Sequence, residues 1–181
     1  SLIGALYASG MGIKMVEQLA REIKRRQWVD LTSPKTGLIA GNKIEGIIKL
    51  LTKGKNFEEL DIPLGVIVCD LTTKSSILIN SGNVAEAVRA SISIPGIFQP
   101  IKKDGHIIVD GGVLERVPAR QARTMGADIV IGVELGFSGN IPIRNIYDVL
   151  IQTFDVMGRE IQKLKNYDAD ILITPDLSDI D

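Results

Sequence analysis

The residues best suited to chemistry lie in the stretch HIIVDGGVLERVPAR, which runs from His106 to Arg120. Apolar residues lead straight into Asp110, and Gly111 and Gly112 follow it. This pattern predicts a carboxylate at the end of a buried strand, before a tight turn in which the glycines leave it unobstructed. Because chemistry in α/β sheets gathers at the carboxyl ends of strands, Asp110 is a candidate general base. The alternative is that Asp110 only braces the turn by accepting backbone N–H groups.

Other polar residues carry weaker signals. Asp70 ends the apolar stretch GVIVCD and is expected to serve the turn after it. His106 is the only histidine, so no other residue could complete a Ser-His-Asp triad. Four residues of extended strand separate it from Asp110 by roughly 13 Å, so it is predicted to be a surface hairpin residue. Cys69 is the only cysteine, which excludes an intramolecular disulfide and a cysteine-rich zinc site.

Helices and strands that could position Asp110 alternate along the chain. Helical periodicity and caps predict helices at 2–8, 15–23, 43–51, 84–91, 118–125 and 146–164. Apolar runs predict strands at 63–71, 76–80, 97–101, 106–110, 127–135 and 169–177. Asn42 and Asn83 are the expected helix caps, and residues 102–105 the expected hairpin turn. The pattern predicts a single α/β domain over residues 1–181, a three-layer sandwich whose mainly parallel sheet is flanked by helices.

Composition narrows the classes of partner. The chain has 181 residues, 45% of them hydrophobic, and a net charge of -1, which suits a globular core and gives no electrostatic footprint for nucleic acid. No apolar run reaches the length of about 18 residues that a spanning helix needs. A cytoplasmic or membrane-peripheral location is therefore expected. Arg25 and Arg26 beside Trp28 could contact a membrane surface, or they could form a solvated helix end.

Four stretches together resemble the patatin-like phospholipase family of bacterial type. In chain order they are LIGALYASG, GLIAGNKIEGIIKLL, GNVAEAVRASISIPGIFQPI and VDGGVLERVPARQARTMGADIVIGVEL. In that family a serine in a G-x-S-x-G turn attacks an ester carbonyl, an aspartate assists it without histidine, and a glycine-rich loop binds the oxyanion. The resemblance implies that Asp110 is the catalytic base, that the substrate is an acyl lipid or other ester, and that no cofactor is needed. No metal-ligand spacing or phosphate-binding fingerprint is visible either.

The resemblance extends to a second part of the site. Ser91, Ser93, Ile94 and Pro95 resemble the family's stretch that passes beside the catalytic centre. The alternative is a plain helix end with a proline stop.

The nucleophile half of the family pattern is absent from the sequence. No G-x-S-x-G occurs, and Ser1, Ser9 and Ser138 each have a glycine missing or misplaced. By the family pattern, the nucleophile, the oxyanion loop and the first strand are expected upstream of Ser1, so this chain is expected to be inactive. It would then expose a sheet edge through which copies could associate. The alternatives are a non-catalytic module of the same fold that binds lipid or protein and, more weakly, a nucleotide-handling domain.

Overall fold

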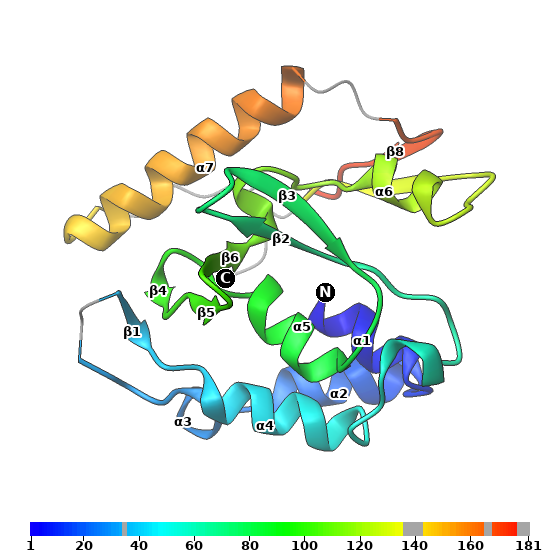
Figure 1. Ribbon diagram of the computed structural model, residues 1–181, viewed down its shortest axis with the longest axis horizontal. Coiled ribbons are helices and arrows are strands. Elements are labelled where there is room, and N and C mark those ends of the chain that lie inside the picture. The colour runs from blue at the N-terminus through cyan, green and yellow to red at the C-terminus, as the bar shows by residue number, and fades with distance from the viewer. Residues whose placement is uncertain (34–35, 136–142, 165–167, 177–181) are drawn as a thin grey trace. The chain divides into compact units, whose positions relative to one another are not determined.

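The computed structural model describes residues 1–33, 36–135, 143–164 and 168–176 (Figure 1). The chain divides into two compact units, Ser1–Gly111 and Gly112–Asp181. The first unit contains Asp110 and the segments that surround it.

The helices of the first unit are α1 (Leu2–Ala8), α2 (Ile13–Glu22), α3 (Arg25–Trp28), α4 (Asn42–Leu51) and α5 (Val84–Ser91), with a short 3-10 turn η1 (Phe57–Glu59). Four of them, α1, α2, α4 and α5, begin and end close to their predicted positions, whereas α3 and η1 were not predicted. The predicted cap of α5 is confirmed, because Oδ1 of Asn83 accepts the backbone N–H groups of Ala85 (3.1 Å) and Glu86 (3.3 Å). Such a cap satisfies donors that would otherwise lack partners in the first helical turn.

The predicted cap of α4 is wrong. Asn42 is the first helical residue, and Gly41 precedes it in the left-handed conformation at φ 87°. The cap is Asp30, whose carboxylate accepts the N–H groups of Gly41 (2.7 Å), Asn42 (2.8 Å) and Lys43 (3.2 Å). Burial acts to raise the pKa of Asp30, but these backbone hydrogen bonds outweigh it and hold the pKa below its ordinary value. A carboxylate is also favoured at a helix N-terminus.

The main sheet of the first unit has the strand order β3-β2-β6-β5. Its strands are β2 (Val66–Asp70), β3 (Ser75–Ile79), β5 (Ile101–Lys103) and β6 (His106–Asp110). Every neighbouring pair in it is antiparallel, which differs from the predicted mainly parallel sheet. For two of these three pairs the reason is a short connection: a short turn joins β2 to β3, and a turn at Asp104 and Gly105 joins β5 to β6. A parallel crossover needs a dozen or more residues.

Parallel pairing occurs outside that sheet. In the first unit β1 (Gly37–Ile39) pairs in parallel with β4 (Gly96–Phe98). In the second unit β7 (Ile131–Val133) pairs in parallel with β8 (Ile171–Ile173). Helices and strands thus combine in an α/β chain, as predicted, with both strand directions present.

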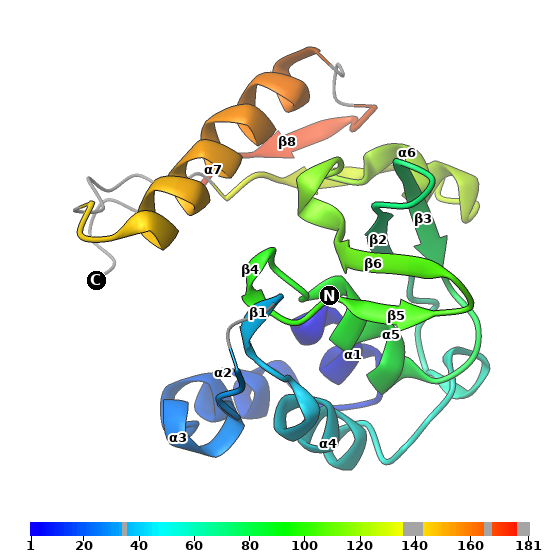
Figure 2. The same ribbon diagram turned by 60° about the vertical axis from the view of Figure 1, so that its left-hand side comes forward.

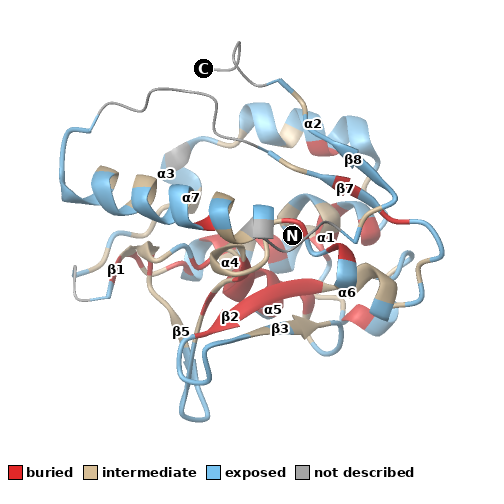
Figure 3. Ribbon diagram, turned by 90° about the horizontal axis from the view of Figure 1, so that it is seen from above, coloured by how far each residue is buried: buried red, intermediate tan, exposed pale blue. Residues whose placement is uncertain are grey.

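The core of the first unit is centred on α5, with buried apolar residues of α1, α4, β1, β2 and β4 around it. Helix α5 packs against β2 and β6, and α1 and α4 pack against α5 (Figure 1 and Figure 2). Strand β2 is buried along its whole length, as Figure 3 shows. Trp28 packs against this core, its ring 6.3 Å from that of Phe98, so it is half-buried and not a free surface anchor. The side chain of Arg25 lies outside the described part of the chain.

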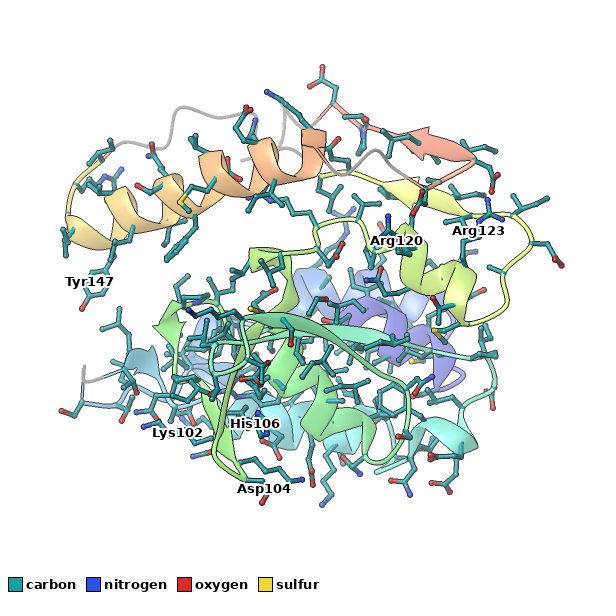
Figure 4. All side chains as sticks on the ribbon, turned by 45° about the horizontal axis from the view of Figure 1, so that its top comes forward. Lys102, Asp104, His106, Arg120, Arg123 and Tyr147 are labelled. Atoms are coloured by element: carbon teal, nitrogen blue, oxygen red, sulfur yellow. The ribbon has the colours of Figure 1, made fainter. Side chains whose placement is uncertain are left out.

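The second unit contains α6 (Ala119–Thr124) and α7 (Ile146–Leu164) besides β7 and β8. Arg120 of α6 forms an ion pair with Asp168 (2.9 Å), and Arg123 forms one with Asp170, just before β8. Figure 4 labels both arginines on α6. These contacts join α6 to the chain entering β8.

Candidate active site

Asp110 lies at the end of β6, as the sequence predicts. It is aligned with Val68 of the buried strand β2. Its backbone N–H donates a hydrogen bond of 3.0 Å to the carbonyl oxygen of Ser93. The half-buried Asp110 is therefore held between the centre of the sheet and the segment that follows α5.

The glycine after Asp110 is needed for space. Gly111 is buried, and a Cβ at this position would collide with the carbonyl group of Ile67 in β2. A turn does follow Asp110, as expected, but the φ of Gly111 lies outside the left-handed region, so the glycine is required here for close backbone approach. Gly112 follows in the 3-10 turn η2 (Gly111–Val113). The Asp-Gly pair thus ends β6 against the backbone of β2.

The start of α1 lies within electrostatic reach of Asp110. Desolvation lowers the pKa of the amino group of Ser1, and the Asp110 carboxylate acts in the opposite direction and raises it. The Asp110 carboxylate therefore lies near Ser1, the residue that precedes α1. Ser9, at the other end of this helix, is buried and donates its hydroxyl to the carbonyl of Ala5 (2.7 Å), as a helix-end residue does. Ser138 lies outside the described residues.

The predicted lining residues separate into different environments. Ser93 is fully buried and is bonded to Asp110 through its carbonyl oxygen. Ser91 is buried in the last turn of α5, Pro95 is half-buried, and Ile94 is exposed. Of this group, Ser93 is the residue that the structure joins directly to Asp110.

Arg89 is a central residue of this region that the sequence analysis missed. Only 1% of its surface is exposed, and its Nη1 donates to the hydroxyl oxygen of Ser93 at 2.6 Å. The Ser93 hydroxyl in turn donates to the carbonyl of Arg89 at 3.0 Å. The available signal was an arginine within the otherwise small and apolar run AVRAS, in a helix whose residues are nearly all buried. Burial lowers the pKa of Arg89 from its usual value.

The other strand-end carboxylate, Asp70, performs its predicted role in the turn. It accepts the N–H of Thr72 (2.9 Å) and the hydroxyl of Thr73 (2.8 Å). The missed contact is with His106, whose Nδ1 lies 2.6 Å from Oδ2 of Asp70. Burial acts to raise the pKa of Asp70, but the hydrogen bonds and the nearby imidazole outweigh it and lower the pKa well below its usual range.

His106 belongs to the β5–β6 hairpin, as predicted. Figure 4 shows it on that hairpin with Lys102 and Asp104. Its ring contacts Asp70, the carboxylate that serves the turn after β2.

Within the ranges that the structure describes, there is no group of three or more His, Cys, Asp or Glu residues that could hold a metal ion. Of the helices described, none combines the length and the apolar character that crossing a membrane requires.

Comparison with known proteins identifies the family. The sequence pattern described as "Patatin-like phospholipase" matches residues 1–123, and the chain belongs to this family. The α/β fold class expected from the resemblance is thereby confirmed. Its relatives carry the names of phospholipases and esterases, which are hydrolases.

Several relatives match most of the chain. Patatin-like phospholipase domain-containing protein 7 of Rattus norvegicus is 30% identical over 163 residues, covering 83% of this chain and 12% of that protein. Patatin-like phospholipase domain-containing protein 6 of Homo sapiens is 33% identical over 144 residues, covering 75% and 10%. An uncharacterized NTE family protein of Mycobacterium bovis is 28% identical over 148 residues, covering 80% and 41%. The chain spans about a tenth of the length of the animal relatives.

Proposed function

We propose that the intact protein is a serine acyl hydrolase that uses a Ser–Asp dyad, with Asp110 as the general base. The nucleophile would be a serine upstream of Ser1, in a G-x-S-x-G turn that leads into α1. The observation that carries this proposal is the position of Asp110 at the carboxyl end of β6, where its carboxylate lies near enough to act on Ser1, the residue before α1. A serine a few residues before Ser1 would then lie within reach of the carboxylate.

The proposed chemistry follows from the properties of the two groups. A serine hydroxyl is a weak nucleophile until a neighbouring base accepts its proton. Asp110 would take that proton as the oxygen attacks the ester carbonyl, and would pass it to the departing alkoxide, so that the alcohol leaves and an acyl-enzyme forms. Water would then attack the acyl-enzyme, release the acid and restore the serine. Backbone N–H donors of an upstream glycine-rich loop would stabilise the oxyanion, each contributing about 3–4 kcal/mol.

The proposed substrate is a carboxylic ester of an acyl lipid, such as a phospholipid. Membership of the patatin-like phospholipase family supports this choice. So does the name neuropathy target esterase, borne by the Drosophila melanogaster protein that is 30% identical over 158 residues. A peripheral encounter with a lipid surface and association of copies through an exposed sheet edge belong to the same proposal.

The test is active-site labelling with a fluorophosphonate probe. We expect the complete polypeptide to be labelled at a serine upstream of Ser1 and the 181-residue chain to remain unlabelled. Labelling of any serine within the 181 residues would overturn the proposed position of the nucleophile. A complete, folded polypeptide that does not react would overturn the dyad and favour a non-catalytic module that binds lipid or protein.

A further inference from the structure

We propose that Arg89 is a positioning residue that fixes the place of Asp110 through Ser93. The inference rests on the proposed function, because it assigns a role in the reaction to a group that does not touch the substrate. It is carried by an unbroken series of contacts from the guanidinium to the backbone of Asp110.

The guanidinium of Arg89 donates hydrogen bonds to three segments of the first unit. Its Nε donates to the carbonyl of Gly41 at 3.1 Å. Its Nη2 donates to the carbonyls of Ala40 (2.6 Å) and Gln99 (3.0 Å), and its Nη1 to the hydroxyl of Ser93 (2.6 Å). The planar fork of an arginine can hold several acceptors at defined angles, which a flexible lysine cannot do. Arg89 therefore sets the positions of these segments relative to one another.

The surroundings of Arg89 indicate a geometric role. The acceptors named above are neutral oxygens, while Glu45 and Asp30 act on the guanidinium through their charges. The guanidinium also lies over the ring of Phe98, 5.2 Å from its centroid. Burying a cation among neutral partners costs free energy that an apolar side chain of similar volume would avoid. A cation retained in such a place is best explained by the placement of the groups that it binds.

Ser93 connects this arrangement to the candidate base. Its hydroxyl accepts from Arg89 Nη1 and donates to the carbonyl of Arg89, so the side chain is held from two sides. Its own carbonyl oxygen accepts the N–H of Asp110 at 3.0 Å. Gly111, the next residue, lies against the backbone of Ile67. A shift of Ser93 would therefore move Asp110 relative to the serine that it has to deprotonate.

The expected consequence is a loss in the chemical step. A displacement of about 1 Å in a catalytic group can lower a rate on the order of 100-fold. Substrate binding would change little, because Arg89 is buried away from solvent. A role limited to stability would instead lower the melting temperature and leave the turnover of the folded enzyme unchanged.

The experiment compares Arg89→Lys, Ser93→Ala and their double variant in the complete polypeptide. The matched control is Val88→Ala, which creates a cavity at the neighbouring, fully buried position of α5 and removes none of the hydrogen bonds of Arg89 and Ser93. The readouts are the rate and endpoint of fluorophosphonate labelling, kcat and KM for a p-nitrophenyl ester, the melting temperature, and hydrogen exchange at the Asp110 amide. The labelling endpoint counts folded enzyme, so it separates misfolding from slow chemistry.

We expect Arg89→Lys to lower kcat and the labelling rate by about 10- to 100-fold, with KM within about twofold and faster exchange at the Asp110 amide. Ser93→Ala should give a smaller loss of kcat. The fold-loss of kcat in the double variant should be less than the product of the fold-losses of the two single variants. Val88→Ala should lower the melting temperature with kcat unchanged. Equal kcat losses in Arg89→Lys and Val88→Ala, or an unchanged Asp110 amide in Arg89→Lys, would overturn the inference. A wild type that neither reacts with the probe nor turns over ester would instead overturn the proposed function.

Discussion

Asp70 and His106 form a pair across neighbouring strands, with Oδ2 of Asp70 2.6 Å from Nδ1 of His106. The carboxylate is completely buried, while 48% of the histidine side chain is exposed. Thr72 and Thr73 donate to the same carboxylate from the turn after β2. The pair therefore connects the β2–β3 turn to the β5–β6 hairpin. Asp110 belongs to the same sheet but lies at the opposite end of β6 from His106.

This pair predicts a pH dependence of stability. The pKa of Asp70 in the folded state lies below its ordinary value of 3.8, so folding favours the ionised form. The stabilisation is complete above pH 3.8 and is lost as the pH falls below that value towards the folded pKa. We expect Asp70→Asn to lower the urea midpoint clearly at pH 7 and less at pH 3. Asp104→Asn, on the exposed tip of the hairpin, is the control; a constant difference between Asp70→Asn and wild type at both pH values would contradict the prediction.

The general-base role of Asp110 predicts a large loss of turnover. In the complete polypeptide, Asp110→Asn should lower ester turnover by about 10²–10⁴-fold, because an amide cannot accept the serine proton. The measurement is hydrolysis of a p-nitrophenyl ester, with circular dichroism to verify folding. Glu115→Gln, five residues further on, serves as the control for a general charge effect. Unchanged turnover in a folded Asp110→Asn protein would remove Asp110 from the reaction.

The cap of α4 predicts that a substitution at Asp30, which lies outside the helix in the sequence, lowers the stability of the protein. Asp30→Ala removes the acceptor of the Gly41, Asn42 and Lys43 N–H groups and should cost about 1–2 kcal/mol of unfolding free energy. Asp30→Asn keeps an acceptor oxygen but loses the charge, and should cost less. Urea unfolding monitored by circular dichroism measures both variants. If Asp30→Ala unfolded at the wild-type midpoint, the capping role would be wrong.

Two glycines at α4 predict effects of opposite sign. Gly41 has φ 87°, and a Cβ there would collide with the guanidinium of Arg89. Gly41→Ala should therefore destabilise by about 2–4 kcal/mol, from backbone strain and displaced hydrogen bonds. Gly46 lies within the helix with open space where its Cβ would be, so Gly46→Ala should stabilise by about 0.5–1 kcal/mol. Equal effects of the two substitutions would contradict this account.

The second unit predicts self-association of the 181-residue chain. Among the described residues, β7 pairs with β8 alone, and both strands expose apolar side chains, including Ile131, Val133 and Ile171. An exposed apolar strand pair is a template for further strands. We expect light scattering to show a mass that grows with concentration, and Ile131→Lys to reduce the effect. A monodisperse monomer at every concentration would count against the prediction.

Local signals in the sequence were enough to predict the positions of several helices and strands. The small-residue run 2–8 and the Asn83 cap predicted α1 and α5 with their observed bounds. The positive φ angles of Asp104 and Gly105 match the hairpin turn that was expected there. The position of Asp110 at a strand end was predicted correctly. A pattern of only a few residues, an apolar run followed by a carboxylate and two glycines, is enough to indicate where the strand ends. Whether it acts as a base stays a prediction.

The tertiary structure decided the contacts that join distant residues. Asp30 caps a helix that begins 12 residues later, Asp70 meets His106 36 residues on, and Arg89 binds Gly41 across 48 residues. No periodicity or motif encodes such partners, because each contact exists only after the strands and helices have packed and buried polar groups have found acceptors. The antiparallel pairing of β2 with β6, which lie far apart in the sequence, was likewise decided by packing. The sequence alone thus determined the local elements and the position of the carboxylate, whereas packing determined what holds that carboxylate in place.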